Sequence, residues 1–313
     1  MAAVATTHHV GDAAGLISSL LPRCTFPAPD TAVCCAVSGG PDSTALLVLA
    51  VAAGCRVEAV HVDHGLRDGS ADELDVVRRT AATLGVTARG VRVVVAPGPN
   101  LEARARSARY AALPPGVLTG HTADDQAETV LLNVLRGAAT DGLSGMRPGV
   151  AHPLLQLRRS ETVALCRAAG LTTVDDATNA DTTFLRNRVR HELLPLLGDA
   201  ARRDLVPVLA RQAALLRDDA DLLDLLASEI DPTDARALTA APLALSRRAV
   251  RRWLATDGDG HPPDQATVER VLAVASGTAL ACEVGAGRRV ERHRQRLSLV
   301  RHRSPESNVG SVV

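Results

Sequence analysis

The sequence predicts an α/β protein in which a parallel sheet with helices on both faces is followed by a smaller, mostly helical domain. Three observations lead to this fold class. Short apolar runs alternate with helical segments over the first part of the chain, as they do in βαβ units. A turn of glycine and serine joins the first apolar run to the first helix. Beyond residue 198 the pattern is helical until two strand-like runs near the end.

The strands expected in the sheet are apolar runs, because strands buried on both faces lack polar alternation. They are residues 33–37, 57–62, 86–95 and 117–119. The helices expected after them carry apolar residues at helical spacing and polar residues at their starts. They cover residues 44–53, 70–84, 100–113 and 123–136.

The remainder of the chain predicts loops, then helices, then a ribbon. Glycine and polar residues predict a flexible loop at 137–153 and a polar loop at 171–183, and helices are expected at 160–169, 185–197, 201–227, 243–255 and 265–276. The runs 279–284 and 288–300 flank a Gly-Ala-Gly turn and predict an antiparallel ribbon. We therefore expect a catalytic domain over 1–198, a helical domain ending in a basic ribbon over 199–303, and a disordered tail over 304–313.

Composition narrows the class of protein. The 313 residues are 46% apolar and carry no formal net charge, so no overall field attracts the chain to nucleic acid. Residues 283–303 nevertheless hold seven arginines against two glutamates, and arginine suits phosphate. The six cysteines form no CxxC pair, which fits a reducing compartment. Without a signal peptide or a long apolar span, we expect a cytoplasmic protein that makes no membrane contact.

The strongest single motif is the turn after the first predicted strand. It consists of Ser38, Gly39, Gly40, Pro41, Asp42 and Ser43. Strand, glycine turn and helix direct backbone N–H groups and a helix N-terminus at one point, which suits a phosphate or pyrophosphate. An ordinary capped turn is the alternative. The chain contains no lysine, so this is no Walker A loop.

Two further clusters lie near predicted strand ends. His61, Asp63 and His64 lie at the end of the second strand, where they predict a polar wall for a nucleotide, with a metal site as the less favoured alternative. Glu102, Arg106 and Arg109 share one helix face. They predict either an arginine clamp on phosphate or a solvated, salt-bridged helix.

A third cluster follows the last strand of the sheet. Thr122 can cap a helix whose first turn carries Asp124 and Asp125, which complement the helix dipole. Capping alone does not require Glu128, which falls on the same helix face as Asp125. These two carboxylates can share Mg²⁺, or one can act as a base.

A fourth cluster surrounds the start of the helix at 185–197. Thr178, Asn179 and Asp181 precede it, and Arg186 and Arg190 lie on one face of it. Basic residues near a helix N-terminus oppose the dipole, so this placement indicates a bound anion.

The glycine turn SGGPDS resembles the PP-loop of the N-type ATP pyrophosphatases, an adenine nucleotide alpha hydrolase-like group. Further motifs occur in the same order and spacing: HVDHGLR, LEARARSARY, GHTADDQAETVLLNVLRG, HPLL and DATNADTTFLRNRVRHELLPLL. Together, over about residues 30–198, they resemble the tRNA(Ile)-lysidine synthetase family. His152 stands where that family usually has arginine.

The resemblance implies a ligase that uses ATP and Mg²⁺ to join L-lysine to the wobble cytidine of an isoleucine tRNA with a CAU anticodon. An adenylated cytidine would form first, AMP and pyrophosphate would leave, and the tRNA would change identity from methionine to isoleucine. The wobble base would be splayed out, with Tyr110 and Phe184 as the expected stacking partners. The oligomeric state stays open, with a homodimer among the alternatives.

The same resemblance implies residue roles. Asp42 and Asp125 would act in catalysis together with Arg106, Arg109, Arg186 and Arg190. Asp125 would handle the lysine ammonium, and Asp42 or Glu128 would hold Mg²⁺. The nucleotide would contact the turn residues 38–43 and the side chains of His61, Asp63 and His121.

Three rival functions differ in their sequence requirements. A PP-loop tRNA thiolase needs a sulfur carrier, typically paired cysteines or an Fe–S cluster, and the sequence has no CxxC. A small-molecule ligase would not need the basic end of the chain. A non-catalytic nucleotide-binding module would not need Asp125 and Glu128.

Overall fold

The computed structural model describes residues 12–63, 70–93, 104, 108, 111–174, 181–256 and 263–301. The chain divides into two compact units, Met1–Leu215 and Leu216–Val313. The division falls inside one long helix, α10 (Val206–Ser228).

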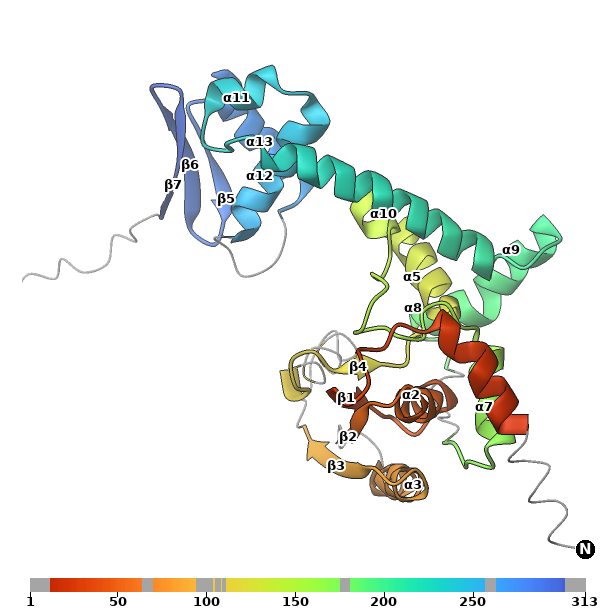
Figure 1. Ribbon diagram of the computed structural model, residues 1–313. Helices are drawn as coiled ribbons and strands as arrows, with labels where there is room; N and C mark the ends of the chain where they lie inside the picture. The colour runs from red at the N-terminus through yellow and green to blue at the C-terminus, as the bar shows by residue number, and fades with distance from the viewer. Residues whose placement is uncertain are drawn as a thin grey trace, which may run out of the picture. The chain divides into compact units, whose positions relative to one another are not determined.

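A four-stranded parallel sheet forms the centre of the first unit (Figure 1). Its strands are β1 (Ala32–Ala36), β2 (Arg56–Asp63), β3 (Thr87–Arg92) and β4 (Leu118–Thr119). They lie in the order β3-β2-β1-β4, and all three neighbouring pairs are parallel. The parallel sheet predicted from the alternation of apolar runs and helices is thus confirmed.

Two helices lie on the same side of this sheet, α2 (Pro41–Ala52) and α3 (Ser70–Thr83) (Figure 1). This placement follows from right-handed crossovers that run from β1 to β2 and on to β3. A third helix, α7 (Arg159–Ala168), packs on α2. Because α2 lies between the sheet and α7, its residues from Ser43 to Ala50 are all buried.

The helix expected at 100–113 falls mostly outside the described residues. Arg104, Ala108 and residues 111–112 are helical. Residues 12–20 form a helix that the sequence did not lead us to expect, and it continues into a 3₁₀ turn at Leu21–Arg23. None of the described helices is long and apolar enough to cross a membrane.

The segment after β4 differs from the predicted flexible loop. Helix α5 (Ala123–Leu135) is followed by a short helix, α6 (Thr140–Leu143). The Gln126 side chain bonds both the N–H and the C=O of Met146, at 2.8 and 3.1 Å. Asn133 donates to the Gly142 carbonyl at 2.6 Å. Side chains of α5 therefore tie this glycine-rich segment down, which composition alone could not indicate.

The helix predicted at 185–197 is interrupted. It consists of α8 (Leu185–Arg188), a π-helical turn (Val189–Leu193) and α9 (Leu194–Ala201). Wide turns of this kind occur often at functional sites. The next helix, α10, begins at Val206 rather than at 201, because Arg202 ends α9 in a left-handed conformation.

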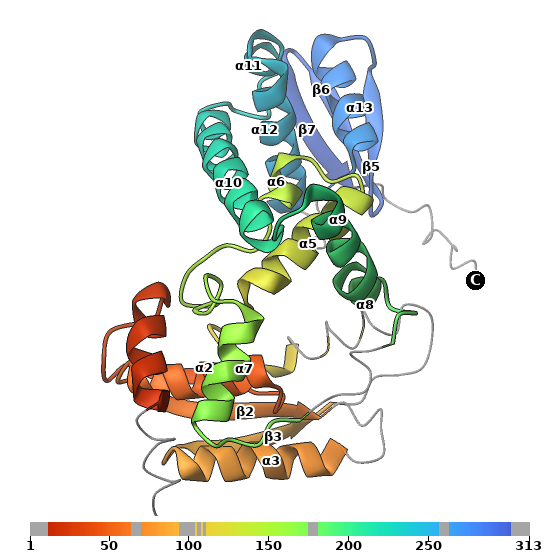
Figure 2. The same ribbon diagram turned by 90° about the vertical axis from the view of Figure 1, so that its right-hand side faces the viewer.

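The second unit packs three helices on a three-stranded antiparallel sheet (Figure 2). The helices are α11 (Ala235–Ala240), α12 (Leu243–Thr256) and α13 (Gln265–Ser276); the strands are β5 (Ala281–Gly285), β6 (Arg288–His293) and β7 (Arg296–Arg301). The predicted single run 288–300 is therefore two strands. Arg294 and Gln295 turn the chain between them, both at positive φ. The core contains Val250, Val271 and Val290, each fully buried.

Candidate active site at the ends of β1 and β4

The predicted phosphate turn links β1 to α2. The Ser38 N–H donates to Ser43 Oγ at 3.2 Å, and Ser43 Oγ donates to the Gly40 carbonyl at 2.9 Å. Gly40 is the N-cap of α2 and offers no side-chain cap to the helix. No side chain of the N-cap residue therefore covers the backbone N–H groups at the start of α2, as a phosphate cradle requires.

Two glycines let the backbone approach closely here. Gly39 has φ +89°, and a Cβ there would lie 2.9 Å from Val174 Cγ2. Gly120 follows β4, and a Cβ there would lie only 2.6 Å from the carbonyl oxygen of Asp42. The turn after β4 is therefore pressed directly against the start of α2.

Asp42 points from α2 toward α7. Its Oδ2 accepts from Arg159 Nε at 3.0 Å, and its Oδ1 accepts a short hydrogen bond from the Thr162 hydroxyl. Burial raises the pKa of Asp42, and Arg159 and Thr162 offset only part of that effect. The carboxylate of the phosphate turn is thus held by two residues of α7.

Asp125 and Glu128 lie together on α5, as their spacing predicts. Asp125 Oδ2 accepts from the N–H and the hydroxyl of Thr122, at 2.8 and 2.9 Å. Asp125 therefore caps α5 with one oxygen and keeps the other for different partners. Glu128 is almost fully buried, with 1% of its surface exposed.

Arg159 joins these carboxylates into one cluster. Its Nη1 donates to Glu128 Oε1 at 3.1 Å and its Nη2 to Asp125 Oδ1 at 2.9 Å, in addition to the bond from Nε to Asp42. One guanidinium thus binds three carboxylates from two elements. Sequence reasoning missed Arg159, although its position at the start of α7 opposes the helix dipole just as Arg186 does at the start of its helix.

Arg186 is the second cation of the cluster. It donates from Nε to Glu128 Oε2 at 2.8 Å and from Nη2 to Asp125 Oδ1 at 3.1 Å. Arg190 Nε lies 4.0 Å from Glu128 Oε1. Burial alone would raise the pKa of Asp125, but Arg159, Arg186, His121 and the Thr122 N–H together lower it.

A neighbouring ion-pair group supports α7. Arg158 donates to Asp124 at 3.1 Å and makes a short bond to Asp204, while Asp124 also accepts from the Arg159 N–H at 2.9 Å. Asp124 is therefore turned away from Asp125 and toward α7.

Beside the cluster lies a cavity of about 470 Å³, lined by Asp124, Glu128, Arg159, Ser160, Val163, Arg190, His191 and Leu194.

Histidines surround the sheet ends. His61 is buried and its Nδ1 lies 2.9 Å from the Val37 carbonyl, whereas its buried Nε2 has no hydrogen-bond partner among the described residues. Thr119 Oγ1 lies 2.8 Å from His121 Nδ1 and 2.7 Å from His152 Nδ1. The two rings meet edge to face at 5.0 Å. His152 is thus packed against a predicted nucleotide contact.

The other predicted site residues lie outside this cluster or outside the described part of the chain. Asp63 ends β2 and is half-buried, and Asp181 bonds the N–H and the hydroxyl of Thr183, both at the surface. Phe184 is 37% exposed. The predicted sites that lie outside the described residues are His64, Glu102, Arg106, Arg109, Tyr110, Thr178 and Asn179.

The carboxylates offer the oxygen donors that Mg²⁺ prefers. Every carboxylate oxygen of Asp42, Asp125 and Glu128 already has a protein partner: Arg159, Arg186 or Arg190, or the threonines 122 and 162. Within the described part of the chain no group of three or more His, Cys, Asp or Glu is arranged to hold a metal. Carboxylate oxygens suit Mg²⁺, but Asp42, Asp125 and Glu128 would have to exchange contacts with Arg159 to bind it.

Two family models each match one part of the chain, and known proteins match most of its length. Residues 16–197 match the family described as PP-loop domain, and residues 234–298 match the family described as TilS substrate binding domain. A tRNA(Ile)-lysidine synthase of Nocardia farcinica is 44% identical over 77% of this chain and 80% of its own length. The corresponding protein of Mycolicibacterium paratuberculosis is 47% identical over 72% of this chain and 75% of its own.

A solved structure shares the fold. The U34-tRNA thiolase NcsA from Methanococcus maripaludis superposes with a TM-score of 0.52 at 16% sequence identity, over 67% of this chain and 80% of its own. At that identity the likeness concerns the fold alone. The family matches and the relatives, which cover most of both chains, show that this chain belongs to the tRNA(Ile)-lysidine synthase family.

Proposed function

We propose that the chain ligates L-lysine to the wobble cytidine of an isoleucine tRNA with a CAU anticodon, and that the carboxylate–arginine cluster is the reaction centre. The observation that carries the proposal is Arg159, which links Asp42 of the phosphate turn to Asp125 and Glu128 of α5. The nucleotide-binding turn and the carboxylates of α5 therefore belong to one site.

ATP binds first at the turn after β1 and adenylates the cytidine O2, with release of pyrophosphate. The N-terminus of α2 and the hydroxyls of Ser38 and Ser43 are donors for the pyrophosphate. His61 offers a buried Nε2 without a partner among the described residues, which suits a polar atom of the nucleotide. Asp63 and His121 complete the polar wall.

Lysine then attacks the ring carbon next to the adenylated oxygen, and AMP leaves. The lysine amine has an unperturbed pKa of about 10.4, so it arrives protonated and inert. Asp125 attracts the ammonium and orients it, and the proton is lost before attack. The lowered pKa of Asp125 keeps this carboxylate charged when the ammonium arrives.

The arginines stabilise the negative charge of the phosphate groups during the reaction. Arg186 and Arg190 stand beside Glu128, and Arg106 and Arg109 complete the set that we assign to phosphate. Asp42 and Glu128 would hold Mg²⁺, in place of their contacts with Arg159. When bound there, the ion would neutralise charge on the phosphate oxygens of ATP.

Residues 199–303 bind the tRNA. Exposed arginines of the β6–β7 hairpin, such as Arg294 and Arg301, supply charge for backbone phosphates. We accordingly assign catalysis to residues 1–198 and tRNA binding to 199–303. The reaction belongs in the cytoplasm, where the tRNA is found.

The test is a reaction of purified protein with ATP, Mg²⁺, isoleucine tRNA transcript and each of the twenty free amino acids. We expect incorporation of lysine alone, with AMP and pyrophosphate formed in step with it. Formation of ADP and phosphate, or incorporation that does not depend on the cytidine at the wobble position, would contradict the proposal.

A further inference from the structure

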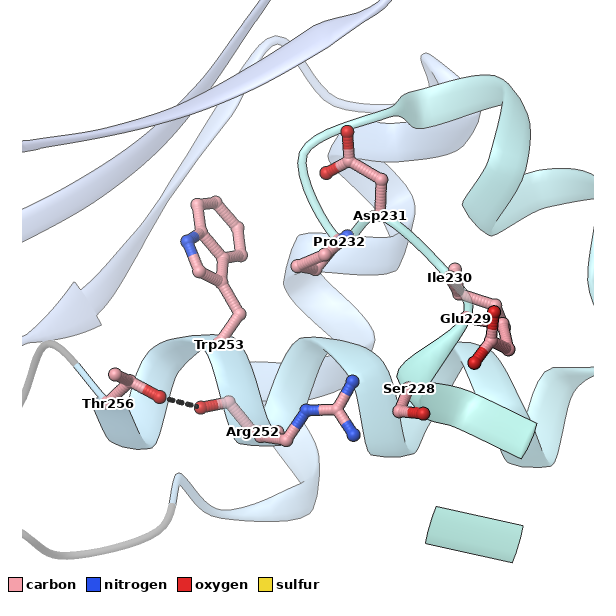
Figure 3. A pocket seen from close by; sticks show the side chains of 8 residues that line it. All are labelled: Ser228, Glu229, Ile230, Asp231, Pro232, Arg252, Trp253 and Thr256. Atoms are coloured by element: carbon pink, nitrogen blue, oxygen red, sulfur yellow. Dashed lines mark hydrogen bonds between the residues drawn. The ribbon is translucent and has the colours of Figure 1, made fainter. Parts of the chain in front are cut away.

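A second cavity is lined only by residues of the second unit, none of which is assigned to catalysis (Figure 3). It measures about 500 Å³ and is lined by Ser228, Glu229, Ile230, Asp231, Pro232, Arg252, Trp253 and Thr256. This volume lies in the range of small-ligand pockets, roughly 300–1,000 Å³. The cavity therefore offers room for a ligand of nucleotide size.

Trp253 supplies an aromatic face. It is the single tryptophan of the chain, and it extends from α12 toward the segment that carries Asp231 and Pro232 (Figure 3). The side chain is half-buried, packed at the margin of the core of the second unit. Its indole N–H finds no hydrogen-bond acceptor in the described part of the chain. A fixed, partly exposed indole is a stacking platform of the kind that single-stranded nucleic acid uses.

The polar groups around the indole fall into two kinds. Asp231 is fully engaged, because its carboxylate accepts from the N–H and the hydroxyl of Thr233 and from Arg296 at 2.8 Å. Arg252 is held by the Ala227 carbonyl at 3.0 Å. Glu229 differs from both, because none of the described residues donates to its exposed carboxylate. Glu229 is thus the acceptor that a ligand would find.

We propose that this cavity binds an unstacked guanine base of the tRNA, stacked on Trp253 and hydrogen-bonded to Glu229. The inference rests on the proposed tRNA substrate. Guanine presents N1–H and N2–H₂ side by side, so a carboxylate can accept both. Adenine and cytosine present one amine next to an acceptor nitrogen that a carboxylate repels. Uracil presents one N–H between two carbonyls.

Arg252 suits the phosphate of the same nucleotide. Its guanidinium is positioned by backbone carbonyls near the end of α10, including Asp224 O at 3.4 Å, and it forms an ion pair with none of the described carboxylates. Charge-assisted contacts to phosphate are strong and position the chain without reading sequence. Arg252 would therefore place the nucleotide, while Trp253 and Glu229 would select its base.

The single tryptophan allows a direct test. With excitation at wavelengths where tryptophan is the only absorbing side chain, and after correction for light absorbed by the nucleotides, emission of the full-length protein reports on Trp253 alone. Titration with isoleucine tRNA transcript, and separately with GMP, AMP, CMP and UMP, should quench this emission. We expect GMP to quench at a concentration at least about fivefold lower than the other three, because it alone satisfies both oxygens of Glu229.

Filter binding of the same tRNA separates this inference from the proposed function. If tRNA binds and the emission does not change, the cavity does not hold a base and the proposed function is untouched. If no tRNA binds at all, the proposed function fails as well. Quenching by lysine or by ATP in place of GMP would show that the cavity serves another ligand and would overturn the inference.

Variants refine the assignment. Glu229→Gln should abolish the preference for GMP while keeping the quenching itself. Glu283→Gln removes another exposed carboxylate of the same unit and is the charge-matched control. Trp253→Phe keeps an aromatic ring at the margin of the core and should weaken tRNA binding severalfold. Equal selectivity for GMP in the wild type and Glu229→Gln would refute the role of Glu229.

Discussion

The Nε of Arg159 lies 3.0 Å from Oδ2 of Asp42, a contact that joins residues 117 positions apart in the chain. Through its two other nitrogens the same guanidinium binds Asp125 and Glu128. A planar fork with three separate donor positions is required for this arrangement, and an ammonium could not reproduce it.

Arg159→Lys should therefore keep the charge and lose the geometry. We expect lysine transfer to fall by about 100-fold, because misplacing reacting groups by an ångström has effects of that size. The measurement is incorporation of labelled lysine into tRNA. Arg167→Lys changes an exposed arginine of the same helix and should leave the rate within about twofold of wild type. Full activity of Arg159→Lys would show that the cluster is not the reaction centre.

Arg159→Ala should also destabilise the fold. It leaves Asp42, Asp125 and Glu128 close together without the cation that they share, and breaking a buried ion pair in this way costs about 3–5 kcal/mol. The free energy of unfolding from urea titration measures this loss. An unchanged urea midpoint would contradict the view that these three carboxylates depend on Arg159.

Asp125→Asn should abolish transfer and spare ATP binding. The asparagine oxygen can still accept from Thr122 and cap α5, so the fold is retained, whereas the negative charge that meets the lysine ammonium is lost. We expect a rate reduced by about 100-fold or more, together with a higher lysine requirement. Asp218→Asn, on an exposed part of α10, is the matched control. Loss of ATP binding with lysine binding retained would identify Asp125 as a metal ligand instead.

Acid titration should distinguish Asp125 from Asp42. The pKa of Asp125 is lowered in the folded protein, so its contribution to stability is complete above the pKa of the unfolded chain and is lost as pH falls through the folded value. The pKa of Asp42 is raised, so protonation of Asp42 favours the folded state as pH falls. Urea midpoints between pH 3 and 6 should fall less steeply for Asp125→Asn than for wild type, and more steeply for Asp42→Asn. The same slope in all three proteins would contradict both assignments.

Replacing Arg294 and Arg301 with glutamine should weaken tRNA binding without affecting the nucleotide site. Each lost phosphate contact should lower the slope of log affinity against log salt by about 0.7–0.9. Binding of tRNA between 50 and 200 mM salt measures this slope. Arg78→Gln, on the exposed surface of α3, is the control, and a slope equal to that of the control would exclude the hairpin as a phosphate contact.

The sequence was informative where local pattern determines structure. Buried strands, the glycine turn and the helix with Asp125 and Glu128 all follow from neighbouring residues. The counter-ions of these carboxylates could not be found in that way, because Arg159 lies 31 residues from Glu128 and Arg186 lies 58. Only the unfavourable position of an arginine at a helix start gave a signal, and we used it for Arg186 and Arg190 but not for Arg159.

The second unit was predicted less well for a similar reason. Helix α11 has six residues, too few for a helical period to be distinct. The turn between β6 and β7 places Arg294 and Gln295 at positive φ, where glycine or asparagine would have been the usual signal. Tertiary packing of Val290 and Leu297 stabilises the hairpin in spite of that turn.

Gly120 limits how the nucleotide turn can vary. Any side chain there would meet the backbone of Asp42 and Ser43. The segment after β4 therefore packs directly on the first turn of α2 and prevents that turn from moving toward it. On the other side Gly39 is joined to Val174 by a backbone hydrogen bond of 2.9 Å and has no room for a methyl group. The shape of the cradle therefore depends on the absence of a side chain at both glycines, although neither of them contributes a functional group.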